Sequence, residues 1–206
     1  PRMRGGSVPV IYNECNYKDR YVDEYTGELL PAPLIRHAIE DELNYFNEKV
    51  WQLCSQEEMK KIPDYILVRS RWVLCNKGDR DDPDVRARLV ACEVNKDGKN
   101  DACSASTPPL EGKKILFTKF TSSPRKAKLR LSFVDIRKAY FNGIPERAVF
   151  MHLPKEMGMP TGMVARQVRC VYGTRDAGKI WEDTYTQVLS QWDLHPGRLT
   201  HAFSII

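Results

Sequence analysis

The stretch "FVDIRKAYFNG" (residues 133–143) holds the residue types best suited to chemistry in this sequence. Asp135 stands at the end of the apolar run Leu131–Val134, which predicts a strand. Burying an unpaired carboxylate is costly, so Asp135 is expected either to cap a turn or to meet a cation. Arg137 and Lys138 follow it at once. Such a group suits either a salt-bridge network or a site for a triphosphate with a divalent ion, because phosphoryl transfer uses metal ions and basic side chains together.

Further basic residues gather in the segment 69–88 and around residues 169–175. The formal net charge of the chain is +5. This charge is compatible with a polyanionic partner, and equally with an ordinary basic surface. The residues concerned are Arg69, Arg71, Lys77, Arg80, Arg86, Arg88, Arg169 and Arg175.

The composition excludes several classes of protein. The six cysteines form no CxxC pair, and neither they nor the four histidines have metal-ligand spacing, which predicts a reduced intracellular protein. No apolar run approaches the ~20 residues that span a bilayer, and the first residues lack a signal-peptide core. We therefore expect no membrane partner and a location in the cytoplasm or nucleus. No nucleophile elbow, P-loop or dinucleotide fingerprint supports a small-molecule enzyme.

Hydrophobic periodicity predicts the elements that would position these residues. A helix is expected from Pro33 to about Trp51, and a charged-tip hairpin from strands 64–77 and 85–94. A second helix is expected at 110–120, and strands at 148–154 and 165–173. The last helix, 176–192, has Ile180, Thr184, Val188 and Trp192 as candidate inward positions. Helices that alternate with antiparallel-looking hairpins indicate an α+β fold.

Six stretches, in order, resemble the reverse transcriptases of copia-type retrotransposons. "VDIRKAYFNG" resembles the family's first catalytic motif, in which a strand and an Asp precede an aromatic-x-Asn-Gly turn. "RSRWVLCNK" and "VRARLVA" resemble its fingers strands, the second of which usually reads Lys-Ala-Arg-Leu-Val-Ala. "ASTPPLEGKKILF" resembles its Ser-Pro turn and helix, and "FMHLPKEMG" its aromatic-x-x-x-Pro-x-Gly segment. "VRCVYGTRDAGKIWEDTY" resembles its Leu-Tyr-Gly-Leu-Lys-Gln-Ala-Pro-Arg-Ala-Trp motif.

This resemblance covers about residues 36–206 and implies the fingers and a partial palm of a right-hand polymerase. The sheet would be antiparallel and packed by helices. The implied division is an irregular arm (1–30), a helical lead-in (31–55), fingers with the basic β-hairpin (56–127) and a partial palm with a fingers return segment (128–206). The intact enzyme would transfer deoxynucleotides onto an RNA or DNA template-primer. Its further partners would be deoxynucleotide triphosphates and the RNase H and integrase parts of a polyprotein.

The resemblance also implies roles for single residues. Asp135, with the backbone carbonyl of Ile136, would bind Mg²⁺ or Mn²⁺ in the intact polymerase. Tyr140 would stand under the incoming sugar and exclude a 2′-hydroxyl by a steric clash; the alternative is a core aromatic beside Phe141. The residues implied at the nucleotide are Arg86, Arg88, Ile136, Lys138, Ala139, Tyr140, Gly173 and Arg175.

The sequence also departs from the family pattern. Asp176-Ala177-Gly178 replaces the usual Gln-Ala-Pro, and Arg86 replaces a Lys with its charge kept. The second catalytic motif, Tyr-Val-Asp-Asp or similar, is missing, and with it two of three catalytic carboxylates. We therefore expect this chain alone to bind nucleic acid weakly and not to polymerise. The alternative is a decayed, non-catalytic nucleic-acid-binding or assembly domain derived from such a polymerase.

Overall fold

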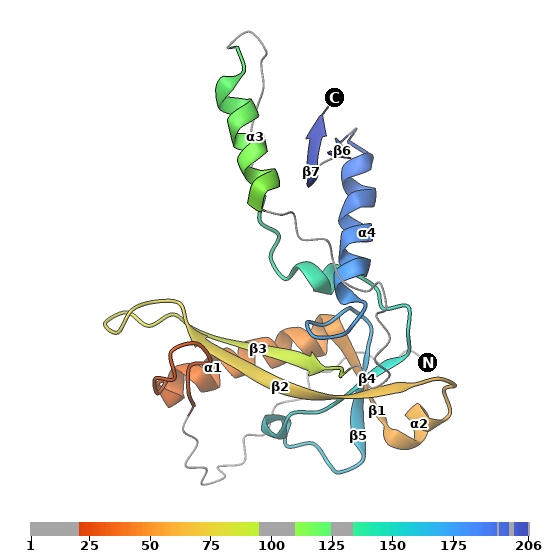
Figure 1. Ribbon diagram of the computed structural model, residues 1–206. Coiled ribbons are helices and arrows are strands. Elements are labelled where there is room, and N and C mark those ends of the chain that lie inside the picture. Colours follow the sequence, from red (N-terminus) through yellow and green to blue (C-terminus); the bar gives the residue numbers. More distant parts are fainter. Residues whose placement is uncertain (1–20, 95–109, 125–133, 193, 198–199, 206) are drawn as a thin grey trace. The chain divides into compact units, whose positions relative to one another are not determined.

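The computed structural model describes residues 21–94, 110–124, 134–192, 194–197 and 200–205 (Figure 1). The chain divides into two compact units. The first comprises residues 1–94 and 145–174, and the second comprises residues 95–144 and 175–206. Helices and strands occur together along the chain, so the predicted α+β class is confirmed. The finer division into fingers and palm stays a prediction.

The first unit contains a five-stranded sheet with the order β1-β5-β4-β2-β3. Three of the four strand pairs are antiparallel, but β2 and β4 are parallel, so the expectation of an antiparallel sheet is wrong for this pair. The chain between β2 and β4 includes β3 and a long part of the second unit. A connection of that length leaves the direction of the returning strand free, whereas a short hairpin would force it to be antiparallel. The strands are β1 (Trp51–Ser55), β2 (Ile66–Asn76), β3 (Val85–Cys92), β4 (Val149–His152) and β5 (Met163–Gln167).

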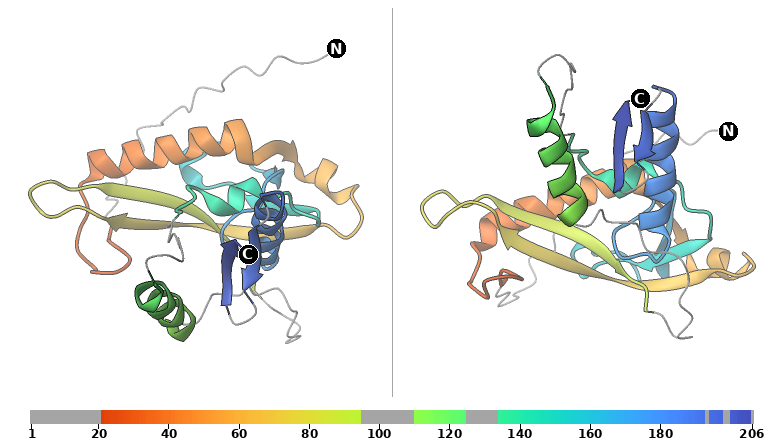
Figure 2. Two further views of the ribbon diagram at one scale, coloured as in Figure 1. Left: turned by 90° about the horizontal axis from the view of Figure 1, so that it is seen from above. Right: turned by 45° about the horizontal axis from the view of Figure 1, so that its top comes forward.

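The predicted first helix is confirmed and covers one face of the β2–β3 hairpin. It comprises α1 (Ala32–Tyr45) and a wider π-turn segment, η1 (Phe46–Val50). Figure 2 shows this helix running along the hairpin. Its apolar positions recur at helical spacing and are almost fully buried, and alternate residues of β3 are buried as well. The buried side chains are Ile35, Ile39, Leu43, Phe46 and Val50 of the helix and Ala87, Leu89 and Ala91 of β3.

The prediction of a helical lead-in as far as residue 55 is wrong for the last five residues. Trp51–Ser55 is the strand β1, which pairs with β5. Ser55 then caps the short helix α2 (Gln56–Lys60) through a reciprocal pair of hydrogen bonds with Glu58. This helix buries Met59 in a small core with Phe150 and Val164.

The predicted strand 165–173 is confirmed only as far as Gln167, the last residue of β5. The next two amides, those of Val168 and Arg169, both donate to the carbonyl oxygen of Val50. The chain therefore leaves the β-ladder and forms the turn that carries residues 171–174. The strand 148–154 is confirmed in its centre as β4, and the short helix η4 (Lys155–Met157) follows it.

The second unit contains the predicted helices α3 (Leu110–Ser122) and α4 (Ala177–Ser190), which are confirmed. It also contains η3 (Ala139–Asn142), β6 (Leu194–Gly197) and β7 (Thr200–Ile205). α4 packs on η3, and its Trp181 and Tyr185 rings lie 5.4 Å apart. Val188 and Trp192 are exposed, so their expected inward orientation is wrong.

The predicted strand before Asp135 falls largely on residues 131–133, which lie outside the described part of the chain. Val134, its last residue, is described. It is 82% exposed and belongs to no strand, so the buried strand end is wrong at this residue. Asp135 is therefore exposed to water, and its charge needs no buried partner.

Candidate nucleic-acid interface

The open face of the β2–β3 hairpin carries a stripe of arginine side chains. Residues two apart on a strand share a face, and the register pairs alternate residues of β3, starting at Arg86, with alternate residues of β2. The pairs on this face are Cys75–Arg86, Val73–Arg88, Arg71–Val90 and Arg69–Cys92, so each rung contributes one arginine. The buried side chains of β3 alternate with these positions and lie on the face that α1 covers. We call Arg69, Arg71, Arg86 and Arg88 the arginine stripe.

The strand register shows how the Arg86 and Arg88 side chains are oriented relative to each other. Both side chains are exposed on the same face of β3, as their spacing of two residues predicts. Successive rungs lie roughly 7 Å apart, because a strand rises about 3.4 Å per residue. This distance is close to the spacing of successive phosphates along an extended nucleic-acid strand. The stripe can therefore offer one guanidinium group to each of several consecutive phosphates.

Two of the four stripe arginines contact carboxylates of the same chain. Arg71 Nη1 lies 2.9 Å from Glu24 Oε1, and Arg86 Nη2 lies 2.7 Å from Asp84 Oδ2. The hydrogen bond to each carboxylate raises the pKa of its arginine further. All four partners are about half exposed, so these ion pairs remain in contact with water.

The other two stripe arginines have no carboxylate partner among the described residues. Arg69 makes no ion pair with any residue in that part of the chain. The Arg88 guanidinium lies over the Tyr172 ring, with its carbon 5.9 Å from the ring centroid. An arginine stacked on an aromatic ring keeps its hydrogen-bond donors available at the edge of the guanidinium plane. Arg69 and Arg88 are therefore the stripe positions best placed to bind an external anion.

The turn that carries Tyr172 is fixed against β3. The Ala91 amide donates to the Tyr172 carbonyl at 2.7 Å, and the Glu93 amide donates to the Gly173 carbonyl at 3.4 Å. Gly173 has a φ of +90°, and a Cβ there would collide with the Ala91 carbonyl oxygen. The glycine that was predicted to admit a nucleotide is thus required by close packing of the protein backbone itself.

A partly buried ion pair supports the same end of β3. Arg147 donates to both carboxylate oxygens of Glu93, at 2.6 and 3.0 Å. The Glu93 side chain is only 7% exposed. A two-pronged contact of this kind holds the end of β3 to the segment that leads into β4.

Residues 21–30 form a turn, here called the clip, that braces the tip of the hairpin. The buried Asp23 carboxylate accepts backbone hydrogen bonds from Tyr25, Thr26 and Asn76, and these bonds hold its pKa below the ordinary value. The Glu24 amide donates to the carbonyl of Leu74. The clip thus satisfies backbone groups along the free edge of β2.

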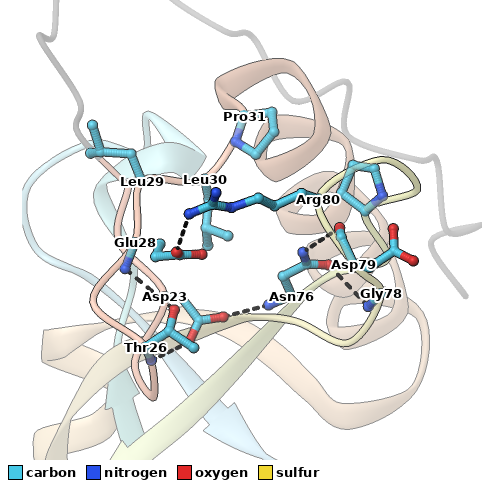
Figure 3. Close-up of a pocket in the computed structure, with 11 residues that line it drawn as sticks. Asp23, Thr26, Glu28, Leu29, Leu30, Pro31, Asn76, Gly78, Asp79 and Arg80 are labelled. Atoms are coloured by element: carbon cyan, nitrogen blue, oxygen red, sulfur yellow. Dashed lines mark hydrogen bonds and ion pairs between the residues drawn. The ribbon is translucent and has the colours of Figure 1, made fainter.

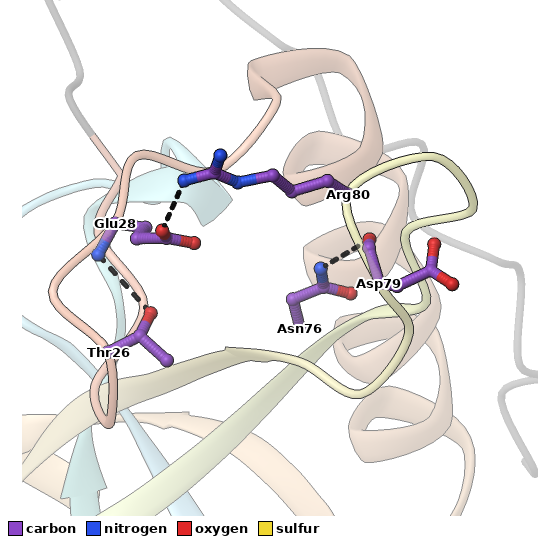
Figure 4. A network of polar contacts seen from close by, with 5 residues as sticks. All are labelled: Thr26, Glu28, Asn76, Asp79 and Arg80. Carbon is purple, nitrogen blue, oxygen red and sulfur yellow. Dashed lines mark hydrogen bonds and ion pairs between the residues drawn. The ribbon is translucent and has the colours of Figure 1, made fainter.

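The clip and the hairpin loop line a pocket of about 540 Å³ that is open to solvent (Figure 3). Arg80 extends across it from the loop and pairs with Glu28 at 2.9 Å, and the Asn76 amide group donates to the Asp79 carbonyl (Figure 4). Its buried carboxylate, Asp23, already accepts backbone amides through both oxygens. The polar groups of the pocket therefore serve to hold the loop.

The remaining predicted site residues lie in the second unit. Asp135 and Ile136 are exposed and precede a sharp turn at Lys138, which has a φ of +53°. A left-handed conformation costs a non-glycine residue energy, and here it leads the chain into η3, which contains Ala139 and Tyr140. Ala139 and Tyr140 are half-buried.

The predicted residues therefore fall into two groups. Arg86, Arg88 and Gly173 belong to the first unit. The second unit contains Asp135, Ile136, Lys138, Ala139, Tyr140 and Arg175, the last of which is half-buried just before α4. That the two groups meet in one cleft stays a prediction.

The described residues do not by themselves fit the metal pair that the family resemblance implies. Asp135 is the one acidic residue between 134 and 144, and no group of three or more Asp, Glu, His or Cys side chains with metal-binding arrangement occurs among the described residues. One exposed carboxylate with a neighbouring carbonyl cannot hold two ions at the separation that phosphoryl transfer uses.

No protein-family model matches this chain, and no solved structure matches it at a significant level. Among the described residues, no helix has both the length and the apolar character needed to cross a membrane.

Sequence reasoning identified the arginines of the hairpin but missed the residues that organise them. In the sequence, Tyr172 stands out only as part of a motif. No local pattern indicates the ion pair of Glu93 with Arg147. Asp23 had a local signal, because Asp followed closely by Thr-Gly is typical of a side-chain-capped turn. The contact of Glu24 with Arg71 had no such signal, since the two residues lie 47 positions apart.

Proposed function

We propose that this chain is the fingers and part of the palm of a copia-type reverse transcriptase, and that the arginine stripe binds the phosphate backbone of the template-primer. The observation that carries the proposal is the stripe itself, with one guanidinium group on each of four successive rungs. Packing against α1 gives no reason for the arginines, because α1 covers the opposite face of the hairpin, where Ala87, Leu89 and Ala91 are buried. Arginines on successive rungs of a hairpin, at phosphate spacing, favour backbone binding without base recognition.

In the intact polymerase, the same hairpin would also supply Arg86 and Arg88 to the triphosphate of an incoming deoxynucleotide. Lys138, Ala139 and Arg175 would contact the nucleotide from the second unit. Asp135 and the Ile136 carbonyl would be this chain's contribution to a site for Mg²⁺ or Mn²⁺ that needs further carboxylates. The partners would be an RNA or DNA template-primer and the RNase H and integrase parts of an intracellular polyprotein.

Tyr140 is proposed as the residue that excludes ribonucleotides. Its position on η3, five residues after Asp135, is the motif position that the resemblance assigns to this role. Steric exclusion requires a large side chain beside the sugar, and Tyr140 supplies a half-buried aromatic ring at that motif position. In a polymerase that contains this segment and is active, Tyr140→Ala should raise ribonucleotide incorporation relative to deoxynucleotide incorporation. An unchanged ratio in a folded, active variant would assign Tyr140 to packing alone.

A second candidate function, nucleic-acid binding without catalysis, is favoured because Asp135 is the one acidic residue in the described segment 134–144. Both candidates predict binding through the stripe, and primer extension separates them. Incorporation of deoxynucleotides by this chain above a protein-free blank, with contaminating polymerase excluded, would reject the non-catalytic candidate.

Binding itself is tested by fluorescence anisotropy with a labelled single strand of about 20 nucleotides, titrated with salt. We expect the logarithm of the binding constant to fall linearly with the logarithm of salt concentration, by about 0.7 per phosphate contact on a single strand. Replacing Arg69 and Arg88 together by Ala should lower affinity roughly tenfold or more at low salt. It should also lower the slope by about 1.4, equally for unrelated sequences.

The matched control is the double variant Arg36→Ala with Lys49→Ala. It removes the same charge from exposed positions on α1 and η1, the helix that covers the opposite face of the hairpin. The control should leave the slope near its wild-type value. Equal losses in the two double variants would reduce the effect to net charge, and the stripe would then have no specific role.

A further inference from the structure

The side-chain carboxylates of Glu24 and Asp84 occupy positions at which an external anion would bind the arginine stripe. Glu24 Oε1 lies 2.9 Å from Arg71, and Asp84 Oδ2 lies within hydrogen-bond distance of both Nε and Nη2 of Arg86. The donors used in these contacts are those that a phosphate oxygen would accept from. The stripe is therefore neutralised on alternate rungs, because Arg88 and Arg69 occupy the rungs between and beyond these pairs.

We propose that Glu24 and Asp84 act as internal competitors for the phosphates of a single-stranded nucleic acid. The proposal rests on the proposed function of the stripe and adds its regulation. In the resting chain, Arg69 and Arg88 make the first phosphate contacts. Arg71 and Arg86 join only when a phosphate displaces the carboxylate, so the chain binds more weakly than its four arginines would allow.

The exposure of these pairs makes the exchange feasible. The side chains of Arg71 and Glu24 are 53% and 43% exposed, and those of Arg86 and Asp84 are both 53% exposed. Exposed ion pairs are weak, because water and salt already screen them. A phosphate that arrives on the neighbouring rung, about 7 Å away, is held next to the pair and competes at high effective concentration.

The clip supplies its own control residue. Glu28 pairs with Arg80 at the same distance, 2.9 Å, and through the same kinds of atoms as Glu24 with Arg71. Arg80, however, belongs to the loop between β2 and β3 and lies off the stripe. Neutralising Glu28 therefore changes the net charge and frees an arginine as neutralising Glu24 does, but adds no guanidinium to the rungs.

The test compares Glu24→Gln, Asp84→Asn and Glu28→Gln in the full chain by the same salt titration of single-strand binding. We expect Glu24→Gln and Asp84→Asn each to raise affinity three- to tenfold at low salt. Each should steepen the salt slope by about 0.7, because one more phosphate is neutralised. Glu28→Gln should raise affinity less than twofold with an unchanged slope. Glu24→Ala provides a second variant in which no amide can bond to Arg71.

Arg71→Ala completes the cycle for the first pair. In the Glu24→Gln background it should cancel the whole gain, whereas in the wild type it should change affinity little. If Glu24→Gln and Glu28→Gln have the same effect, or if the gain survives without Arg71, the competitor role is overturned while the stripe stands. If the Arg69 and Arg88 variants leave binding unchanged, the proposed function fails and this inference fails with it.

Discussion

Replacing Gly173 by Ala should destabilise the first unit more than the same change at Gly162. Both glycines have almost the same φ, +90° at Gly173 and +93° at Gly162. A Cβ at Gly162 would meet no atom within 4 Å, whereas at Gly173 it would collide with the Ala91 carbonyl oxygen. The Gly162 variant therefore measures the conformational cost alone, and the difference between the two variants isolates the close approach to β3.

The two costs can be approximated from the geometry. A positive φ costs an Ala about 1–2 kcal/mol, which is the whole expected effect at Gly162. At Gly173 the turn must also move away from β3, which weakens two hydrogen bonds, from the amides of Ala91 and Glu93. Each bond contributes about 0.5–1.5 kcal/mol, so we expect a total of about 2–5 kcal/mol. In a chain of this size that corresponds to a melting temperature lowered by roughly 4–20 °C, against about 2–8 °C at Gly162.

The suitable measurement is urea unfolding monitored by hydrogen exchange at single amides. The chain has two compact units, and a single melting curve would mix the unfolding of both. Exchange at the Ala91 and Glu93 amides should accelerate in the Gly173→Ala variant and stay near wild type in Gly162→Ala. Equal free-energy losses in the two variants, with both amides still protected, would refute the argument that packing against β3 requires this glycine.

Three further predictions concern the elements around the stripe. Asp23 has a lowered pKa in the folded state, so its stabilising effect is present above about pH 4 and is lost as the pH falls through the lowered pKa. Asp23→Asn should therefore reduce the loss of unfolding free energy at acid pH, measured by denaturant melts. An unchanged loss would contradict a stabilising role of the Asp23 carboxylate. Arg147→Ala leaves the Glu93 carboxylate largely buried and should cost about 2–4 kcal/mol; adding Glu93→Gln should recover part of the loss, and a strictly additive double variant would argue against the pair. Ser55→Ala removes the cap of α2 and should cost about 1 kcal/mol in urea melts, with Ser55→Thr as the conservative control; equal losses in both variants would deny the cap any role.

The sequence predicted the elements that local patterns determine. The five apolar residues of α1 and η1 recur every three or four positions, and the turn-rich "GDRDDPD" separates two β-rich segments. Both patterns depend only on neighbours in sequence, and both elements are confirmed. The common face of Arg86 and Arg88 followed from strand geometry for the same reason.

Two features that depend on distant partners were not predicted, the strand β1 and the end of β5. Trp51–Ser55 follows a helix without any breaking residue, and it is a strand because it pairs with β5, more than 100 positions further along the chain. The strand expected to continue to residue 173 ends at Gln167, because the Val50 carbonyl accepts the next two amides. Neither partner is visible in a local window, and β-structure in general depends on such pairing.

The same distinction changes the weight of the candidate site residues. Gly173 matches a motif position, but the nearby Ala91 carbonyl explains its presence without any nucleotide. The Asn-Gly turn after Tyr140 likewise ends a short helix in which the Asn142 side chain donates to the Ala139 carbonyl. Packing accounts for these motif residues, so their presence alone is weak support for catalysis.

Packing does not account for Arg69 and Arg88, which are exposed, have no carboxylate partner among the described residues and follow the spacing of the rungs. Solvated charges of one sign on one face repel each other, so an anionic partner would lower the energy of this arrangement. Binding measurements on the stripe of the hairpin therefore test the proposed function more directly than any assay of the motif glycines.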